Sequence, residues 1–228
     1  MIEKIPVVIL PLDDEDLDSK LPIAVSKGID AIEIRIDQFK DLDEEYVIKA
    51  IKKIKEYPLG LIGTIRCKEE GGADIHDEKR VRLFELIAEY CDVLDIELNS
   101  KIAEKVIEIA HDEGKLALVS HHDFEKTPNE DYIQQIIDRG IKVGADIIKY
   151  AYKVNSFEDI SRIMCVTSKN RDKKLVAIGM GELGKITRVA GGFFGSIFTY
   201  TFLGKSFAPG QIEAGKLIDE LKFYKLRG

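Results

Sequence analysis

Short runs rich in β-branched and other apolar residues recur along the whole chain, and this repetition restricts the fold more than any other feature. Their centres lie about 27 residues apart, which is room for one strand, one helix and two loops. Most of the runs are continuously apolar, as is typical of parallel strands that are covered on both faces. The predicted strands are 6–12, 31–36, 59–66, 92–98, 115–121, 146–151, 174–180 and 194–200.

Amphipathic stretches lie between these predicted strands. In 43–56, 101–113 and 156–167, apolar residues recur with the period of an α-helix. Asp43 is a predicted N-cap, and Gly114 is a predicted C-terminal stop. The chain therefore alternates strands with helices.

The repetition continues without a break in composition, so no domain boundary is indicated. Eight strand–helix units in a chain of this length favour a closed (β/α)8 TIM barrel over the alternative, a doubly wound open sheet. We expect one catalytic domain over 1–228. The first connection is the least regular, because Pro22 predicts a late helix start or a kink there.

The composition excludes several classes of partner. Asp and Glu number 41 against 34 Lys and Arg, which gives a formal charge of −7 and argues against nucleic acid or an anionic membrane as a partner. No apolar run reaches the roughly 20 residues that span a bilayer, and the N-terminal run lacks a signal-peptide cleavage site. The three cysteines are far apart and form no CxxC pair. We therefore expect a cytoplasmic protein.

A barrel of this kind holds its chemistry at the C-terminal ends of the strands. Lys149 lies inside the apolar run 146–151, where an ammonium group is expensive unless it is paired or neutral. Burial and nearby cations would lower its pKa, which would suit an amine that attacks a ketone. The alternative interpretation, a lysine whose ammonium reaches solvent from an edge strand, is equally compatible with Lys149 alone.

His121 and His122 close the fifth predicted strand. A histidine at this place can carry protons near neutral pH. Adjacent strand residues point to opposite faces, so one of the two should face the barrel mouth and the other the helices. His76 and His111 fall in a loop and a helix, and we interpret both as surface residues.

Charged residues gather at other predicted strand ends. Glu33 and Arg35 share a face of the second strand, Arg66 ends the third strand, Glu70 follows it, and Arg188 follows the seventh. Several arginines at one rim would form a clamp for a carboxylate or phosphate, although any single one could be a surface salt bridge.

Three further patterns have weaker functional meaning. Asp95 and Glu97 share a face of the fourth strand and are candidates to support the site by pairing with an inward cation. The segment 179–185 matches G-x-G-x-x-G, but a dinucleotide fingerprint belongs to the first βα unit, so the loop is better suited to hold a substrate anion. No metal-binding motif is present, and we expect neither a metal nor a cofactor.

Taken together, these segments resemble the type I 3-dehydroquinate dehydratases of the shikimate pathway. The resemblance extends from the first strand almost to the C-terminus, and the order of the motifs makes it specific. The matching segments are EIRID (33–37), TIRCKEEGG (64–72), HDFEKTP (122–128), ADIIKYA (145–151), GKITRVAGGFFGS (184–196) and APGQI (208–212).

The resemblance implies a metal-free barrel, usually a homodimer, that removes water from 3-dehydroquinate to give 3-dehydroshikimate. It implies that Lys149 forms an imine with the substrate ketone. It implies that His122, rather than His121, carries the proton, and that Glu70 orients His122. The residues at the family's substrate-binding positions are Glu33, Arg35, Arg66, Arg188 and Gln211.

The chain departs from the family pattern at two places. Phe207 stands directly before APGQ, where a substrate-contacting Ser is frequent, and Ser206 is one residue earlier. In the first strand, where a Ser can also contact substrate, the chain has Leu10 and Pro11. These changes bear on recognition of the substrate hydroxyls and leave the imine chemistry unaffected.

Two other functions are compatible with parts of the pattern. A class I aldolase also forms an imine on a barrel lysine, but it needs neither the pairing of His122 with Glu70 nor the APGQI segment. A barrel that only binds an anion is the second alternative. It would have no use for a lysine embedded in a strand.

Overall fold

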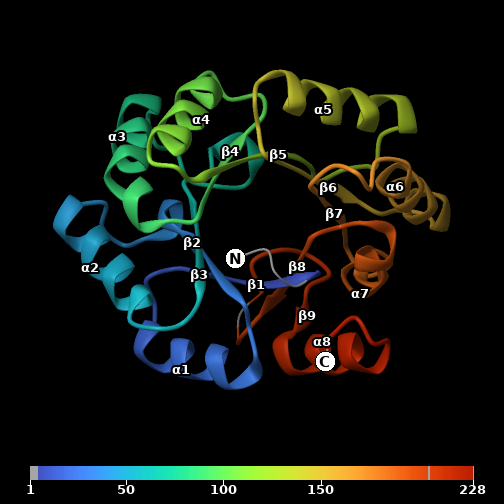
Figure 1. Ribbon diagram of the computed structural model, residues 1–228, viewed down its shortest axis with the longest axis horizontal. Coiled ribbons are helices and arrows are strands. Elements are labelled where there is room, and N and C mark those ends of the chain that lie inside the picture. The colour runs from blue at the N-terminus through green and yellow to red at the C-terminus, as the bar shows by residue number, and fades with distance from the viewer. Residues whose placement is uncertain (1–4, 205, 228) are drawn as a thin grey trace.

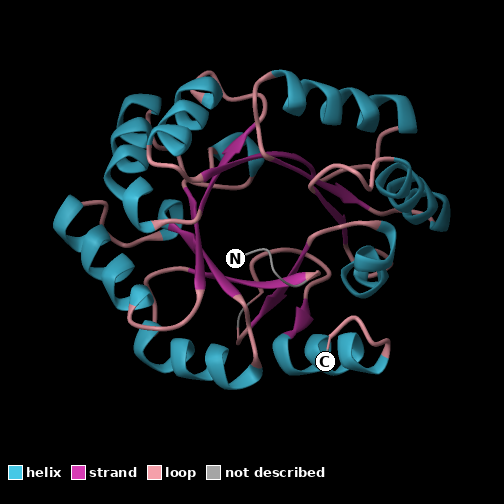
Figure 2. Cartoon of the chain, viewed as in Figure 1, coloured by secondary structure: helices cyan, strands magenta, loops and turns pink. Residues whose placement is uncertain are grey.

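The computed structural model describes residues 5–204 and 206–227 and shows a ring of strands surrounded by helices (Figure 1, Figure 2). The strands are β1 (Val7–Leu12), β2 (Ala31–Arg35), β3 (Gly60–Thr64), β4 (Val93–Glu97), β5 (Leu116–Asp123), β6 (Ile147–Lys153), β7 (Leu175–Met180), β8 (Phe198–Phe202) and the short β9 (Ile212–Glu213). The helices are α1 (Leu17–Lys27), α2 (Glu44–Lys55), α3 (Asp77–Ile87), α4 (Ala103–Asp112), α5 (Glu130–Lys142), α6 (Phe157–Lys169), α7 (Lys185–Phe194) and α8 (Ala214–Phe223).

All the strand pairs are parallel, and the order in the sheet is β7-β6-β5-β4-β3-β2-β1-β8-β9. Because β1 pairs with β2 on one side and with β8 on the other, the first and last parts of the chain share one sheet. The ring closes between β7 and β8 through an isolated bridge from Leu175 to Ser196. The predicted (β/α)8 TIM barrel is therefore confirmed.

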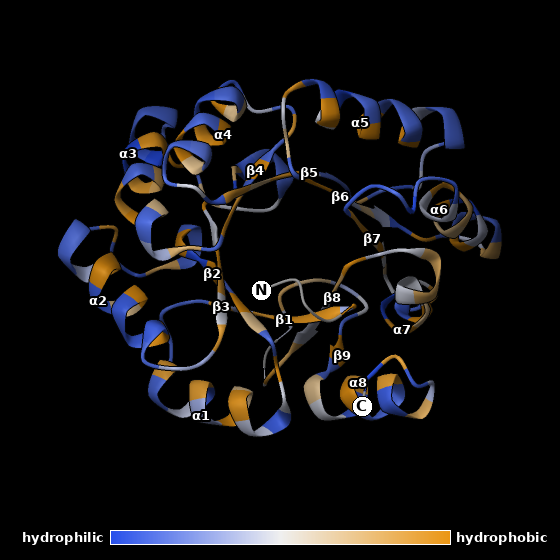
Figure 3. Cartoon of the chain, viewed as in Figure 1, coloured by the Kyte–Doolittle hydropathy of each residue, from blue (hydrophilic) through white to orange (hydrophobic). Residues whose placement is uncertain are grey.

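The barrel has two apolar cores, as the strand alternation requires. Side chains such as Val8 and Leu10 point outward and pack against the helices. Their neighbours Val7 and Ile9 point inward and fill the N-terminal half of the ring. Figure 3 shows largely apolar strands and helices that carry both apolar and polar segments. Among residues 5–204 and 206–227, no helix is long and apolar enough to cross a membrane.

Apart from two places, the predicted element boundaries agree with the structure to within two residues. Asp43 caps α2 by accepting a hydrogen bond from the Glu45 backbone N–H. Of the late start or kink predicted for the first helix, the late start is wrong, because α1 begins at Leu17 and continues through Pro22. The eighth strand was expected from 194, but α7 extends to Phe194 and β8 begins only at Phe198.

Candidate active site

The side chains that point into the barrel change from apolar to polar at one level of the ring. On β2 the inward residues are Ala31, then Glu33 and Arg35. The inward side chains change from apolar to polar in the same way along the third, fourth and fifth strands. The three series are Ile62–Thr64–Arg66, Val93–Asp95–Glu97 and Leu118–Ser120–His122. The apolar half forms a floor, and the polar half opens at the C-terminal end of the barrel, where this fold places its chemistry.

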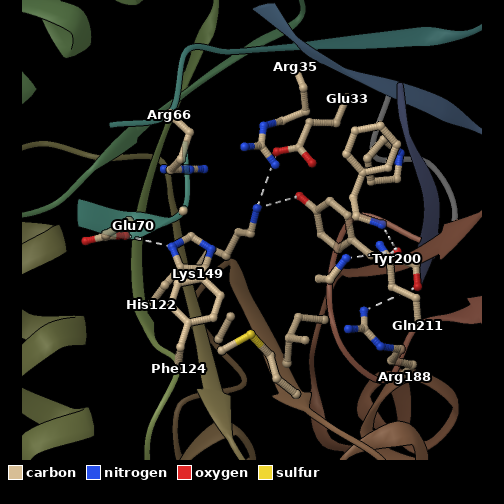
Figure 4. Close-up of a pocket in the computed structure, with 17 residues that line it drawn as sticks. Glu33, Arg35, Arg66, Glu70, His122, Phe124, Lys149, Arg188, Tyr200 and Gln211 are labelled. Carbon is tan, nitrogen blue, oxygen red and sulfur yellow. Dashed lines mark hydrogen bonds and ion pairs between the residues drawn. The ribbon is translucent and has the colours of Figure 1, made fainter. Parts of the chain in front are cut away.

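A pocket lies above this floor, and every site residue predicted from the sequence lines it (Figure 4). The predicted residues are Glu33, Arg35, Arg66, Glu70, His122, Lys149, Arg188 and Gln211. They come from β2, β5, β6, α7 and the loops after β3 and β8, so distant segments converge on one cavity.

Lys149 lies in the middle of β6 and is only 5% exposed. Its Nζ is 3.0 Å from Asp95 Oδ2 and 3.5 Å from Glu33 Oε1, and it donates a hydrogen bond of 3.1 Å to the Tyr200 hydroxyl. The ammonium group is therefore buried but paired. The alternative of a lysine that reaches solvent from an edge strand is wrong.

The expected lowering of the Lys149 pKa is also wrong. Burial alone would lower it, but Asp95 and Glu33 outweigh burial and raise the pKa of Lys149 above its usual value. The pKa of Asp95 responds to the same contacts. Burial would raise it, but the Arg66 guanidinium and the Lys149 ammonium hold it well below its usual range. The free site thus stabilises a positive charge at Nζ.

Arg66 connects the two acids of the fourth strand. Its Nη2 is 2.8 Å from Asp95 Oδ1, and its Nη1 is 3.2 Å from Glu97 Oε1. Nη1 also donates a hydrogen bond of 2.6 Å to the Ser120 hydroxyl. The expectation that Asp95 and Glu97 pair with inward cations is confirmed.

His122 faces the pocket, and its Nδ1 is 2.7 Å from Glu70 Oε2. Burial raises the pKa of Glu70 to about 8. Burial, together with the cations of Arg66 and Lys149, lowers the pKa of His122 well below its usual value. The imidazole is therefore held neutral at physiological pH, in the state that can accept a proton.

His121 points the other way, toward the helix layer, where its ring packs against Tyr132 and Tyr152. The sequence predicted opposite directions for the two histidines, and the structure confirms this. His76 and His111 are exposed, as predicted.

Arg188 is a buried cation that contacts only neutral groups among the described residues. It is 2% exposed and donates hydrogen bonds to the backbone carbonyls of Gly210, Tyr200 and Pro209. Burial without a carboxylate partner lowers its pKa to about 10. A guanidinium in this state has a strong preference for an anion at the pocket.

Gln211 lies in the turn between β8 and β9. Its Oε1 accepts hydrogen bonds from the Phe207 backbone N–H at 2.8 Å and from the Ser206 hydroxyl at 2.9 Å. The side chain thus holds its own turn closed, while the oxygen bonds leave its amide NH₂ as a donor. Phe207 lines the pocket, and Ser206 does not.

The two departures from the family pattern have different consequences. Leu10 points to the helix layer, and Pro11 lines the pocket, so Pro11 replaces any hydroxyl contact from the first strand.

The glycine-rich loop after β7 was expected to hold a substrate anion. The Gly181 backbone N–H donates a 3.1 Å hydrogen bond to the Pro209 carbonyl, so this donor supports the turn, and anion binding by the loop stays a prediction.

Sequence reasoning missed several residues of the site. Tyr200 contacts the Lys149 amine, and its position in the last predicted strand was the available signal. An apolar wall also went unpredicted apart from Pro11 and Phe207, because its other members look like ordinary core residues in the sequence. It consists of Pro11, Phe124, Ala151, Ile178, Met180 and Phe207. Within the described residues, no three His, Cys, Asp or Glu side chains are grouped as metal ligands.

The fold and the site define a (β/α)8 barrel whose C-terminal mouth holds a buried lysine among acids, beside a histidine–glutamate pair. The sequence model of the type I 3-dehydroquinase family matches residues 5–227. The chain belongs to this family.

Individual relatives agree with this assignment. The 3-dehydroquinate dehydratases of Aquifex aeolicus and Methanocaldococcus jannaschii are 39% and 35% identical, covering 96% and 95% of this chain and 100% and 96% of their own. The Aquifex crystal structure superposes with a TM-score of 0.87 at 37% identity, covering 96% of this chain and 98% of its own. A type I enzyme from Clostridium difficile, solved with covalently modified comenic acid, has a TM-score of 0.89 at 26% identity and covers 97% and 93%.

Proposed function

We propose that this protein is a hydro-lyase that converts 3-dehydroquinate to 3-dehydroshikimate in the shikimate pathway, through an imine on Lys149. The observation that carries the proposal is the buried Lys149 amine, 3.0 Å from Asp95 and within the same pocket as the His122–Glu70 pair. Membership of the type I 3-dehydroquinase family supports the same substrate.

The acids around Lys149 suit imine formation even though they raise its pKa. An alkylammonium and a ketone combine to give a protonated imine and one water, so the nitrogen is positively charged before and after the step. Asp95 and Glu33 stabilise the ammonium in the free protein and stabilise the iminium in the same place. A proton passes between the amine and these neighbours during the attack. The paired charges thus stabilise the intermediate without rearranging.

The iminium withdraws electrons and makes the C–H bond beside it acidic. His122 takes this proton, and the C–H electron pair forms an enamine. The enamine then expels the hydroxyl on the next carbon, and His122 returns the proton to the departing oxygen, which leaves as water. Glu70 orients the imidazole through Nδ1 and stabilises its protonated form. Hydrolysis of the product iminium regenerates Lys149.

The remaining predicted residues are proposed to hold the substrate. Arg188 and Arg35 supply positive charge for its carboxylate, and Arg188 is the stronger candidate because Arg35 is already bonded to Asp37. Gln211 supplies an amide donor from the turn that covers the pocket. Glu33 offers a carboxylate to the substrate hydroxyls, and Arg66, which also pairs with Asp95, offers a guanidinium to the substrate from the pocket wall.

Trapping with sodium borohydride tests the central claim. Protein incubated with 3-dehydroquinate and borohydride should gain one substrate-sized adduct in its mass spectrum, and Lys149→Ala should gain none. Lys153→Ala is the matched control, because Lys153 lies on the same strand outside the pocket. An adduct that persists in Lys149→Ala, or no adduct on the unaltered protein, would refute the proposal.

The same trapping, combined with other ketone substrates and with an assay of water release from 3-dehydroquinate, separates the two alternatives from the sequence. An anion-binding barrel would give no adduct. A class I aldolase would give an adduct with its own substrate but would not release water from 3-dehydroquinate. A synthase named as an aldolase, from Thermotoga maritima, resembles the chain only at 12% identity with a TM-score of 0.61, which is a likeness of fold.

We also propose that the protein forms a homodimer. Support comes from exposed apolar side chains around a groove between α6, α7 and α8, among them Phe157 at 73%, Ile186 at 49% and Tyr224 at 48% exposure. Surfaces of this kind frequently mark protein–protein contacts. Sedimentation at micromolar concentration should give twice the chain mass, and a monomer would refute the proposal.

A single catalytic domain over 1–228 and a cytoplasmic location are the last parts of the proposal. The pairing of Val7 with Phe198 and the ion pair of Arg227 with Asp30 support one domain, because both join opposite ends of the chain. Three free cysteines among the described residues suit a reducing compartment.

A further inference from the structure

Arg80 of α3 is a buried arginine outside the pocket that the sequence did not single out. It is 1% exposed and does not line the active-site pocket. Its Nε and Nη2 donate hydrogen bonds of 3.0 and 2.8 Å to the backbone carbonyl of Ile65. Its Nη2 is also 2.5 Å from Glu97 Oε2. Burial of a guanidinium costs free energy unless other groups pair with it, and these contacts of Arg80 compensate for that cost.

Glu97 connects Arg80 to residues of the active site. While Oε2 is bonded to Arg80, Oε1 accepts a 2.8 Å hydrogen bond from the Cys67 backbone N–H and lies 3.2 Å from Arg66 Nη1. Arg80 and Glu97 thus hold the backbone on either side of Arg66 by hydrogen bonds. Arg80 bonds to the Ile65 carbonyl, and Glu97 bonds to the Cys67 N–H.

The segment 65–67, held in this way, positions two groups of the active site. Arg66 reaches from it to Asp95, and the turn Lys68–Glu70 that follows it places Glu70 against His122. A displacement of the segment would therefore disturb both the contact of Arg66 with Asp95 and the contact of Glu70 with His122. Arg80 itself lines a second cavity and does not line the active-site pocket.

We propose that Arg80 and Glu97 form a positioning pair for the dehydration, which fixes the 65–67 segment so that Arg66 stays on Asp95 and Glu70 stays on His122. The inference rests on the proposed function. Neither residue contacts the substrate, and both act through the segment that they hold.

The charges explain why a neutral residue cannot replace Arg80. Two acids on β4, Asp95 and Glu97, compete for Arg66. Arg80 satisfies Glu97 and so leaves Arg66 to Asp95. Without Arg80, Glu97 draws Arg66 toward itself, the Ile65 carbonyl loses both side-chain donors, and the turn that carries Glu70 loosens.

Steady-state kinetics of Arg80→Met, Arg80→Lys and Glu97→Gln test the proposal, with Arg82→Met on the exposed side of the same helix as the control. Arg80→Met should lower kcat by about 10²-fold, the loss expected when catalytic groups are misplaced by about 1 Å. Borohydride should still trap an adduct, because Lys149 is intact. Arg80→Lys should recover part of the loss.

The pH profile separates positioning from a merely structural role. If Glu70 leaves His122, the imidazole loses its carboxylate and keeps the cations Arg66, Lys149 and Arg35, which together outweigh the acid Asp95. The acidic limb of kcat/KM should therefore move to lower pH in Arg80→Met. Glu97→Gln keeps the shape of the side chain, and it decides the question if Arg80→Met does not fold.

Three results would overturn the inference. They are an unchanged pH profile with an unchanged kcat, a loss of activity that follows the folded fraction alone, and additive effects when Arg80→Met and Glu97→Gln are combined. A failure of the proposed function is distinguishable, because it would appear as the absence of turnover and of adduct in the unaltered protein.

Discussion

The His122–Glu70 pair shows how one buried contact sets the acid–base behaviour of the site. The two groups are 2.7 Å apart, at the rim of a pocket that also holds Arg66 and Lys149. Burial makes the carboxylate reluctant to ionise, and the two cations make the imidazole reluctant to accept a proton. The carboxylate is therefore the group that allows His122 to become an imidazolium during the reaction.

Glu70→Gln should change the pH profile in a defined direction. In the unaltered protein the Glu70 carboxyl takes up a proton as pH falls through its pKa of about 8, and the negative charge that stabilises the imidazolium of His122 is then lost. Glu70→Gln removes the nearest carboxylate from the imidazole, while the cations Arg66 and Lys149, which lower the pKa of His122, and Asp95, which raises it, remain. The pKa of His122 should therefore fall further. The acidic limb of kcat/KM should therefore move to lower pH.

The maximal rate of Glu70→Gln should also fall, by about 10²-fold, the lower range of what a positioned proton carrier contributes. Glu69→Gln, an exposed neighbour on the same turn, is the control and should keep the original profile. An acidic limb that stays in place in Glu70→Gln would mean that Glu70 does not govern the protonation of His122.

At the scale of elements, the turn between β8 and β9 closes the pocket by backbone contacts. Gly210 has a φ of +76°, and a Cβ built on it would lie 2.2 Å from the Gly181 carbonyl oxygen. The Gly210 carbonyl also accepts a hydrogen bond from Arg188 Nε. Because Gly210 has no side chain, the turn can approach Gly181 closely. This close approach positions both Arg188 and the neighbouring Gln211.

Gly210→Ala should accordingly weaken substrate binding more than the chemical step. The added methyl group pushes the turn away from Gly181, and Arg188 and Gln211 lose their positions. We expect KM to rise by about tenfold, which corresponds to about 1.4 kcal/mol, with a smaller change in kcat. Initial-rate kinetics with 3-dehydroquinate measure both.

Gly204→Ala is the matched control for this variant. Gly204 also has a positive φ, of +68°, but nothing lies within 4 Å of its would-be Cβ. It shares the backbone strain without the clash. Equal KM values for the two variants would show that strain, and not the seat on Gly181, limits the turn.

The sequence predicted those elements whose signal is local. The apolar runs located the strands, and the strand ends located Lys149, His122 and the arginines, because in a parallel barrel position along the strand determines which end a side chain reaches. The start of β8 was missed because the helix before it is equally apolar. Tyr200 and Arg80 were missed because their roles come from contacts across 51 and 17 residues of chain.

The charge state of Lys149 was the least predictable property of the site. Burial in an apolar strand argued for a lowered pKa, but the outcome depends on acids from two other strands, Glu33 and Asp95. A sequence shows that these acids exist, and only the closed barrel shows their distances. The electrostatics of such a site belong to the assembly of strands and not to any one of them.

At the scale of the whole molecule, the ring of strands has one weak junction. All consecutive pairs from β1 to β7 form ladders, and β8 pairs with β1. Between β7 and β8, the described residues form no ladder, and an isolated bridge joins Leu175 to Ser196, just before β8. Ser196 compensates for the missing ladder with its side chain. Its hydroxyl oxygen accepts a 3.0 Å hydrogen bond from the Ala177 backbone N–H and donates one of 3.0 Å to the Phe198 carbonyl.

Ser196→Ala should therefore weaken barrel closure and leave the chemistry intact. The variant leaves the buried Ala177 N–H without this acceptor, which should lower the free energy of unfolding by about 1–3 kcal/mol. For a chain of this size each kcal/mol corresponds to about 2–4 °C in Tm. Calorimetry measures the shift, and Ser161→Ala on the exposed side of α6 should change stability by less than about 0.5 kcal/mol. Because the groups around Lys149 come mainly from β2–β6, kcat well below Tm should be retained, and an unchanged Tm would show that β7 and β8 are held together by packing alone.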